Sequence, residues 1–443
     1  MSTAAMSVSP MRATSLAALL FAAFVVAMGF GIVLPVLPFV VERLAENPTA
    51  AIVSRHTGLL TGLFMFAIFL FAPLWGRASD KWGRRPIILS GLIGLAASLA
   101  AGSTADSLLW LYVGRFLDGV FASAVVPSSM ALIADVAPSK EWRARRFAWI
   151  GMAITAGFFI APVLSGAVAR IGLREDTPTP VPSVELPFLF TALIALAAAV
   201  LIGCVVGRTP RRPLAAPGTA STETSRAGMA MRMLVLAMLA TATVGALEVA
   251  LTLRAKLELG LDPFMVGVMF AECSFIMFVA QAVVFSPLVR LEATRWLIPV
   301  AVVLLSLGMA VLPLISGYFA LMIIVGVVAA AAGVLAPTLA YWMSLMAGAT
   351  QGRHLGRLSA VTSAGQGIGS AAAGLFLGSQ FGAYAVFLAL SAIMLAAALW
   401  SVRLPWQLVA TAVQSAAGKL DEGRTASAGK SPRIEVGGAH GSL

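Results

Sequence analysis

The sequence predicts an all-α membrane protein, with twelve transmembrane helices in two pseudo-symmetric halves of six. The 443 residues are 60% hydrophobic and only 11% charged, whereas a soluble domain is about a quarter charged. Apolar stretches near the ~20 residues that a helix needs to cross a bilayer follow one another along the chain. Lys and Arg gather in alternate loops between these stretches, as the positive-inside rule predicts for a polytopic protein.

Twelve spans divide the chain into two halves and three polar segments. Residues 208–232 are basic and rich in Pro, Gly, Ser and Thr, which indicates a linker between the halves 16–207 and 233–402. Residues 1–15 form the N-terminal segment, and the Gly/Ser/Ala-rich tail 403–443 is expected to be disordered. The expected spans are 16–40, 57–75, 87–104, 108–133, 147–171, 187–206, 233–253, 265–289, 297–316, 319–346, 359–380 and 383–402.

The distribution of basic residues predicts the orientation. Of 30 Lys and Arg residues, one lies inside a span, six lie in the loops of one side, and the other 23 lie on the side of the termini. Both termini are therefore expected in the cytoplasm, with the protein in a plasma membrane, the bacterial inner membrane by analogy. The six residues of the opposite side are Arg43, Arg55, Arg170, Arg174, Arg254 and Lys256.

Composition argues against several other classes of protein. Cys204 and Cys273 lie in apolar segments, and the three histidines have no ligand spacing, so neither a disulfide framework nor a metal or cofactor site is expected. The net charge of +11 lies in loops between spans, which favours the lipid bilayer over nucleic acid as the partner. Because no nucleophile–base pair falls within the spans, we do not expect an enzyme.

A basic motif separates the second and third spans. Residues 76–86 read Gly-Arg-Ala-Ser-Asp-Lys-Trp-Gly-Arg-Arg-Pro, and we expect them to form a tight, basic turn at the membrane surface. The motif resembles the loop between helices 2 and 3 of the major facilitator superfamily, with Ala78 in place of its leucine. That resemblance implies a conformational gate, with Asp135 pairing with Arg84 or Arg85. The gate residues would be Gly76, Asp80, Gly83, Arg84, Arg85 and Asp135.

The first span carries two prolines, three residues apart. Pro35 and Pro38 lack a backbone N–H, so the helix should bend where neighbouring helices can satisfy the freed carbonyls. With Gly29 and Gly31, this stretch is similar to the first helix of the twelve-span drug/proton antiporters, a branch that includes the tetracycline exporters.

The fifth span is similar to the exporter signature Gly-x-x-x-Gly-Pro-x-x-Gly-Gly. Gly157, Pro162 and Gly166 match it, while Ala161 and Ser165 replace two of its glycines. Small residues are kept at each position, so close helix packing is expected.

Two further patterns support paired halves. Phe-Ala-Pro-Leu at 71–74 recurs as Phe-Ser-Pro-Leu at 285–288, at the ends of the second and eighth spans. The eleventh span has glycines on closely related faces, which we expect to meet the other half: Gly365, Gly369, Gly374 and Gly378.

Four ionisable residues fall inside spans: Arg115, Asp118, Glu248 and Glu272. Each would cost about 2.5–3.5 kcal/mol facing lipid, so they should face a cavity or one another. Arg115 and Asp118 share a helical face, and Asp118 either exchanges protons or only neutralises the arginine. Each glutamate either binds a proton near neutral pH or stays protonated within the packing. Candidate orienting groups for a substrate are Gln281, Tyr341, Trp342 and Gln366.

The leading hypothesis is a monomeric, proton-coupled exporter of amphipathic drugs or toxic metabolites that works by alternating access. Adaptable apolar walls suit lipophilic small molecules better than sugars. Proton-coupled uptake of a small metabolite stays open because Ala161 and Ser165 depart from the exporter signature. The alternative from another class is a membrane receptor that does not transport, or a lipid-modifying enzyme.

Overall fold

The fold is helical throughout the part of the chain that the computed structural model describes, namely residues 11–171, 185–207, 224–284, 291–315, 317–346, 351–377, 382–402 and 406. No strand occurs in those ranges. The helices are α1 (Ala13–Gly31), α2 (Leu37–Leu44), α3 (Ala50–Trp82), α4 (Arg84–Ser103), α5 (Leu108–Asp135), α6 (Lys140–Ile171), α7 (Glu185–Val205), α8 (Thr224–Leu257), α9 (Pro263–Val284), α10 (Leu297–Val311), α11 (Tyr318–Met346), α12 (Gln351–Leu377) and α13 (Gly382–Ser401). Two 3₁₀ helices, η1 (Leu291–Trp296) and η2 (Leu312–Leu314), flank α10.

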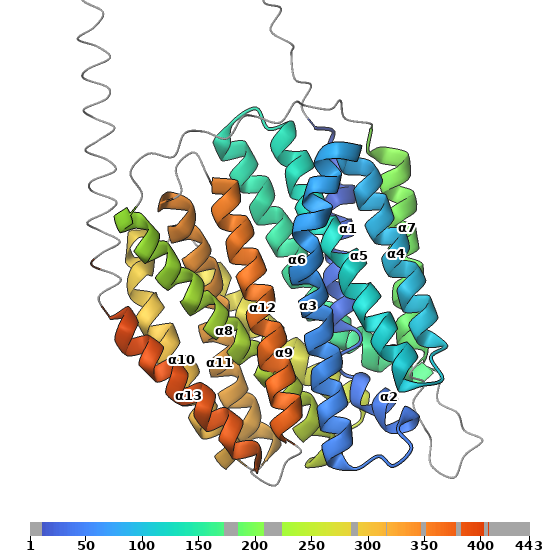
Figure 1. Ribbon diagram of the computed structural model, residues 1–443, viewed down its shortest axis with the longest axis vertical. Helices are drawn as coiled ribbons and strands as arrows, with labels where there is room; N and C mark the ends of the chain where they lie inside the picture. The colour runs from blue at the N-terminus through green and yellow to red at the C-terminus, as the bar shows by residue number, and fades with distance from the viewer. Residues whose placement is uncertain are drawn as a thin grey trace, which may run out of the picture.

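The helices form one bundle in which α1–α7 lie on the right of Figure 1 and α8–α13 on the left. By length and composition, ten helices in the described ranges can cross a membrane, and the segment Ala385–Ser401 of α13 is a shorter apolar one. The glycine-rich α12 lies in the middle of the bundle, beside α3 (Figure 1). With α1 and α2 counted as one interrupted span, each of the twelve expected spans contains a helix, and the predicted fold class is confirmed.

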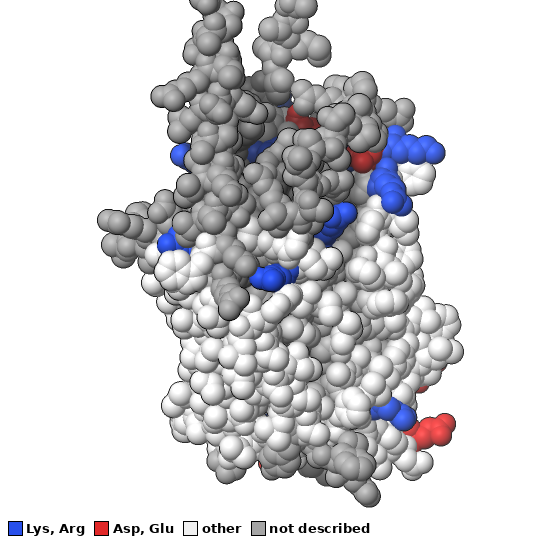
Figure 2. Space-filling model, turned by 60° about the vertical axis from the view of Figure 1, so that its left-hand side comes forward, with Lys and Arg blue, Asp and Glu red and all other residues white. Residues whose placement is uncertain are grey.

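On the face that Figure 2 draws, surface charge lies toward the two ends of the bundle. Figure 2 shows Lys and Arg gathered near its upper end, a broad band without charge below them, and a few charged side chains at the opposite end. We call the end with the basic motif 76–86 the motif end, and the end where α2 lies the far end. The uncharged band is what a bilayer core requires of the surface that faces it.

The first span is interrupted by its prolines. α1 ends at Gly31, a turn follows, and α2 begins at Leu37. Ser165 on α6 donates its hydroxyl hydrogen to the carbonyl oxygen of Ile32 in this turn. The serine stands where the exporter signature has glycine, and it supplies a hydrogen bond to a backbone carbonyl that the break in the helix leaves without a helical partner.

The basic motif, which we expected to form a tight turn over its whole length, is mostly helical. α3 continues through Gly76 and Asp80 to Trp82, and α4 begins at Arg84. Only Gly83 leaves the helical conformation, with a φ of +98° and a ψ of 155°. Such a conformation is strained for any residue with a Cβ atom. The turn is thus a single residue, and most of the motif is helix.

The two halves touch through glycines on the far-end side of the bundle. A Cβ atom on Gly58 of α3 would lie 2.4 Å from the Cα atom of Gly374 on α12. On α6, a Cβ atom on Gly166 would lie 2.3 Å from the Cα atom of Phe264 on α9. Ser54 also donates to the carbonyl oxygen of Gly374 at 2.9 Å. Backbones at such distances leave no room for larger side chains.

The glycines of α12 face in two directions, which corrects our expectation that they all meet the other half. A Cβ atom on Gly365 would lie 2.3 Å from the Met238 carbonyl oxygen, and one on Gly369 would lie 1.8 Å from that of Ala242. Both contacts are with α8, in the same half. Gly374 does meet the other half, and Gly378 lies outside the described residues, as does the second copy of the repeat at 285–288.

Candidate functional site

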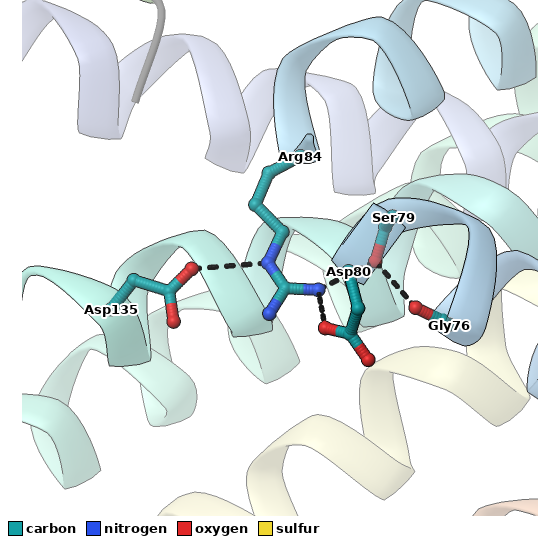
Figure 3. Close-up of polar contacts among 5 residues, drawn as sticks. All are labelled: Gly76, Ser79, Asp80, Arg84 and Asp135. Atoms are coloured by element: carbon teal, nitrogen blue, oxygen red, sulfur yellow. Dashed lines mark hydrogen bonds and ion pairs between the residues drawn. The ribbon is translucent and has the colours of Figure 1, made fainter. Parts of the chain in front are cut away.

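Arg84 is the centre of the polar contacts at the motif end (Figure 3). Its Nε donates to Asp135 Oδ2 at 3.0 Å, and its Nη1 pairs with Asp80 and donates to Ser79 Oγ at 2.6 Å. The Ser79 hydroxyl in turn donates to the carbonyl oxygen of Gly76 at 2.8 Å. One guanidinium thereby joins the last turn of α3, the first residue of α4 and the last residue of α5.

The other motif residues differ in their surroundings. Arg85 Nη2 donates to the carbonyl oxygen of Gly203 on α7, which ties the motif to a further helix of the same half. Gly76 has no atom within 4 Å of an added Cβ position, so its own contacts do not require glycine. Asp80 forms an ion pair with the neighbouring cation Arg84.

Arg115 and Asp118 form a pair buried inside the first half. Their side chains are 1% and 3% exposed, with 3.3 Å between Arg115 Nη1 and Asp118 Oδ2. Asp118 Oδ1 accepts a hydrogen bond of 2.6 Å from Ser98 on α4. The guanidinium lies over the ring of Phe64 on α3, 4.5 Å from its centroid. The carboxylate and the ring together balance the arginine charge at this buried position.

Glu248 and Gln366 meet inside the second half. Gln366 Nε2 on α12 lies 3.1 Å and 2.9 Å from the two carboxyl oxygens of Glu248 on α8. Glu248 is half-buried, and no Lys or Arg forms an ion pair with it in the described part of the chain. An uncompensated carboxyl inside an apolar bundle is costly as an anion, so it is suited to gaining and losing a proton.

The remaining interior candidates make fewer contacts. Glu272 and Gln281 on α9 are half-buried, and no hydrogen bond to either side chain is found between described residues. Tyr341 on α11 is half-buried beside the ring of Trp342, whose Nε1 donates to Thr294 Oγ1. The structure therefore brings together Arg115 with Asp118 and Glu248 with Gln366, in different halves. Over the described residues, no group of three or more His, Cys, Asp or Glu side chains could hold a metal ion.

The glycines of the first and fifth spans pack helices both within and between halves. A Cβ atom on Gly157 would lie 2.5 Å from the Phe24 carbonyl oxygen on α1, and one on Gly31 would lie 3.0 Å from Ala161 Cβ on α6. Gly29, by contrast, has only ordinary contacts, with Leu95 and Leu99. Gly166 and Pro162 face α9 of the other half, where Pro162 closely approaches Gly267. One face of α6 therefore meets α1 and another meets α9.

Several residues at these sites were missed from the sequence. Ser98 and Phe64, which hold the buried pair, are ordinary residues of apolar spans and carry no local signal. Lys256 was placed only as a loop charge, and Glu42, its partner in the other half, was not singled out. Their opposite signs on one side of the membrane were visible, but not their partners.

A model of the Major Facilitator Superfamily matches residues 19–291 and 233–430, which covers most of the chain. The chain belongs to the major facilitator superfamily. This superfamily assignment, with twelve helical spans in two halves, makes the chain a multi-pass membrane protein, as predicted.

Relatives within the superfamily include resistance transporters. The chain is 35% identical over 170 residues to the class H tetracycline resistance protein of Pasteurella multocida. That alignment covers 38% of each chain, so the chain spans well under half of this relative. It is also 25% identical to multidrug resistance protein 2 of Bacillus subtilis (strain 168), over 80% of this chain and 86% of the relative.

Solved structures of transporters share the superfamily fold. The human organic anion transporter MFSD10 (TETRAN) matches 89% of this chain and 100% of its own, with a TM-score of 0.67 and 20% identity. A mutant of the peptide transporter POT, in complex with alafosfalin, matches 91% of this chain and 98% of its own, with a TM-score of 0.72 and 13% identity. At these identities the likeness concerns the fold.

Proposed function

We propose that this chain is a proton-coupled exporter of amphipathic small molecules, tetracyclines among them, that works by alternating access. The observation that carries the proposal is the Glu248 carboxyl, which lies inside the bundle with an amide as its only described hydrogen-bond partner. Relatives named for tetracycline and multidrug resistance support the direction of transport and the substrate class.

Glu248 is the residue proposed to carry the exchanged proton. Arg115 and Asp118 neutralise each other within the first half, so neither charge needs a proton to be stable there. Glu248 has no such partner in the described residues, and replacing a bound proton by a substrate group would change its hydrogen bond to Gln366. α8 and α12 would then be the helices through which binding alters the packing of the two halves.

The driving force is sufficient for export. One elementary charge moving through 100 mV yields about 2.3 kcal/mol. At about 1.4 kcal/mol per decade, this supports a substrate gradient of roughly 50-fold. No source of energy other than the proton gradient is needed in this scheme.

The test uses everted membrane vesicles from cells that express the full chain. With an imposed pH gradient, we expect the vesicles to accumulate tetracycline, and an ionophore that collapses the gradient should abolish this accumulation. Glu248→Gln should remove the response to the gradient, while Glu46→Gln, which alters an exposed carboxyl, should leave it intact. Accumulation that ignores the gradient in the unaltered protein would overturn proton coupling.

A susceptibility panel separates export from uptake. Cells with the protein should tolerate more of the compounds that it exports, among tetracyclines, phenicols, fluoroquinolones and cationic dyes. Greater sensitivity to these compounds would instead support proton-coupled uptake.

A further inference from the structure

Two ion pairs join the halves at the far end. The first links Lys256, near the end of α8, to Glu42 on α2. The Lys256 Nζ atom also donates to the carbonyl oxygen of Pro38 at 2.9 Å and lies 4.3 Å from the ring centroid of Phe39. Because this side chain is only 8% exposed, little water can replace the partners that α2 supplies.

The second pair links Arg170, at the end of α6, to Asp262, just before α9. Both Nε and Nη2 of Arg170 donate to Asp262 Oδ2, at 3.1 Å and 2.6 Å. The other carboxyl oxygen accepts from the backbone N–H of Met265 at 3.0 Å, so the same aspartate caps α9. The guanidinium also lies over the ring of Phe264, 4.1 Å from its centroid.

Each partner is anchored within its own half. Arg43, next to Glu42, pairs with Glu185 at the start of α7 and so fastens α2 to the first half. Arg254, one half-turn before Lys256, donates to the carbonyl oxygens of Leu312 and Ile315, both at 2.7 Å. These contacts fix α8 to the segment after α10. The two inter-half pairs therefore connect rigid elements rather than free side chains.

At the motif end, the described residues show no comparable ion pair between the halves. The ion pairs of Arg84 lie within the first half. The glycine contacts between α3 and α12 and between α6 and α9 lie on the far-end side as well. Among the described residues, the ion pairs between the halves and the closest glycine contacts therefore all lie on the far-end side.

We propose that the pairs Lys256–Glu42 and Arg170–Asp262 form a latch that keeps the far end closed and breaks each time that end opens. The inference rests on the proposed alternating access, because only halves that rock apart must break these contacts. Each half supplies one cation and one anion, so the contact is attractive at two separate points. Of the four side chains, Glu42, Arg170 and Asp262 are 50%, 47% and 38% exposed. Because ion pairs that water can reach are individually weak, the latch can open in every cycle.

The experiment reverses the charges and measures the distance between the halves. Spin labels attached to the full chain through Glu46→Cys and Leu314→Cys, with Cys204→Ser and Cys273→Ser, report the far-end separation by pulsed electron resonance. Both labelled residues are exposed, and neither belongs to the latch. We expect a short distance to predominate in the otherwise unaltered protein. Lys256→Glu or Glu42→Lys alone should shift the population toward longer distances at least about 5-fold, as a coupling of ~1 kcal/mol gives.

The double variant that carries both reversals should restore the short distance. Asp106→Lys, which adds an exposed positive charge at the same end outside the latch, is the control and should leave the distribution unchanged. If Lys256→Glu does not fold, Arg170→Asp and Asp262→Arg carry the same test, since those side chains are 47% and 38% exposed.

Unchanged distances in the single reversals, or a double variant that stays open, would overturn the latch. The measurement needs neither substrate nor a proton gradient. A protein that fails to transport but shows the predicted distances would therefore refute the proposed function without refuting the latch.

Discussion

Gly58 on α3 and Gly374 on α12 lie so close that a Cβ atom on either would come within 2.4–2.5 Å of the Cα atom of the other. Both positions lie within helices, so glycine is needed there for the contact between the halves rather than for a turn. The residues that permit this closure come from segments more than 300 positions apart in the chain, as the Ser54–Gly374 hydrogen bond also illustrates.

Gly58→Ala is expected to disfavour the conformation in which the far end is closed. Overpacking of this kind costs about 1–3 kcal/mol, which corresponds to a shift of roughly 5- to 150-fold between conformations. The spin-label distance described above measures the shift. Gly151→Ala is the matched control, since no atom lies within 4 Å of its added Cβ position. Equal distance distributions for the two variants would contradict the packing argument.

Substitution by alanine should change the stability of the protein differently at the two glycines of the basic motif. Gly83→Ala is expected to destabilise the protein by about 1–3 kcal/mol, because φ is +98° at this residue. Gly76→Ala should be neutral or stabilising by up to about 1 kcal/mol, since Gly76 is helical and has open space around it. Thermal unfolding in detergent measures both. A large loss for Gly76→Ala would point to a contact formed in another conformation.

Replacing one member of the buried pair Arg115–Asp118 should lower the free energy of unfolding more than replacing both members. Asp118→Asn leaves Arg115 charged and buried without an anion, for which we expect a loss of about 3–5 kcal/mol in unfolding free energy. The double variant Arg115→Leu with Asp118→Leu should regain most of that loss, because neither charge is left uncompensated. Asp106→Asn, at an exposed carboxyl, serves as the control. A stable Asp118→Asn protein would mean that the carboxyl is already protonated.

The uneven distribution of Lys and Arg between the two sides predicts that the motif end faces the cytoplasm. In a background with Cys204→Ser and Cys273→Ser, Thr104→Cys at the far end should react with an impermeant maleimide added to intact cells. Gly207→Cys, just after α7 at the motif end, should react only after the cells are opened. Both positions are exposed, so accessibility within the protein is matched. The reverse labelling pattern would invert the topology.

The sequence by itself determined the class of fold, the number of spans and the positions of the unusual residues. Bilayer thickness imposes a length on every apolar run, and the cost of burying charge makes Arg115, Asp118, Glu248 and Glu272 conspicuous within such runs. The prolines of the first span predicted a bend there, because a missing N–H is a local property, and the structure shows a full break between α1 and α2. These signals need no knowledge of what packs against what.

Only the tertiary structure decided which residues pair with one another and which face of each helix meets a neighbouring helix. Glycines at regular spacing on α12 look alike in sequence, yet Gly369 packs against α8 and Gly374 against α3. Glu248 meets Gln366, and Lys256 meets Glu42, across sequence separations of 118 and 214. A helix surrounded by lipid and by other helices has apolar residues on all sides, so hydrophobic periodicity cannot tell which face meets a neighbour. In this chain the contacts between halves depend on backbone approach and on the placement of single charges, which packing alone establishes.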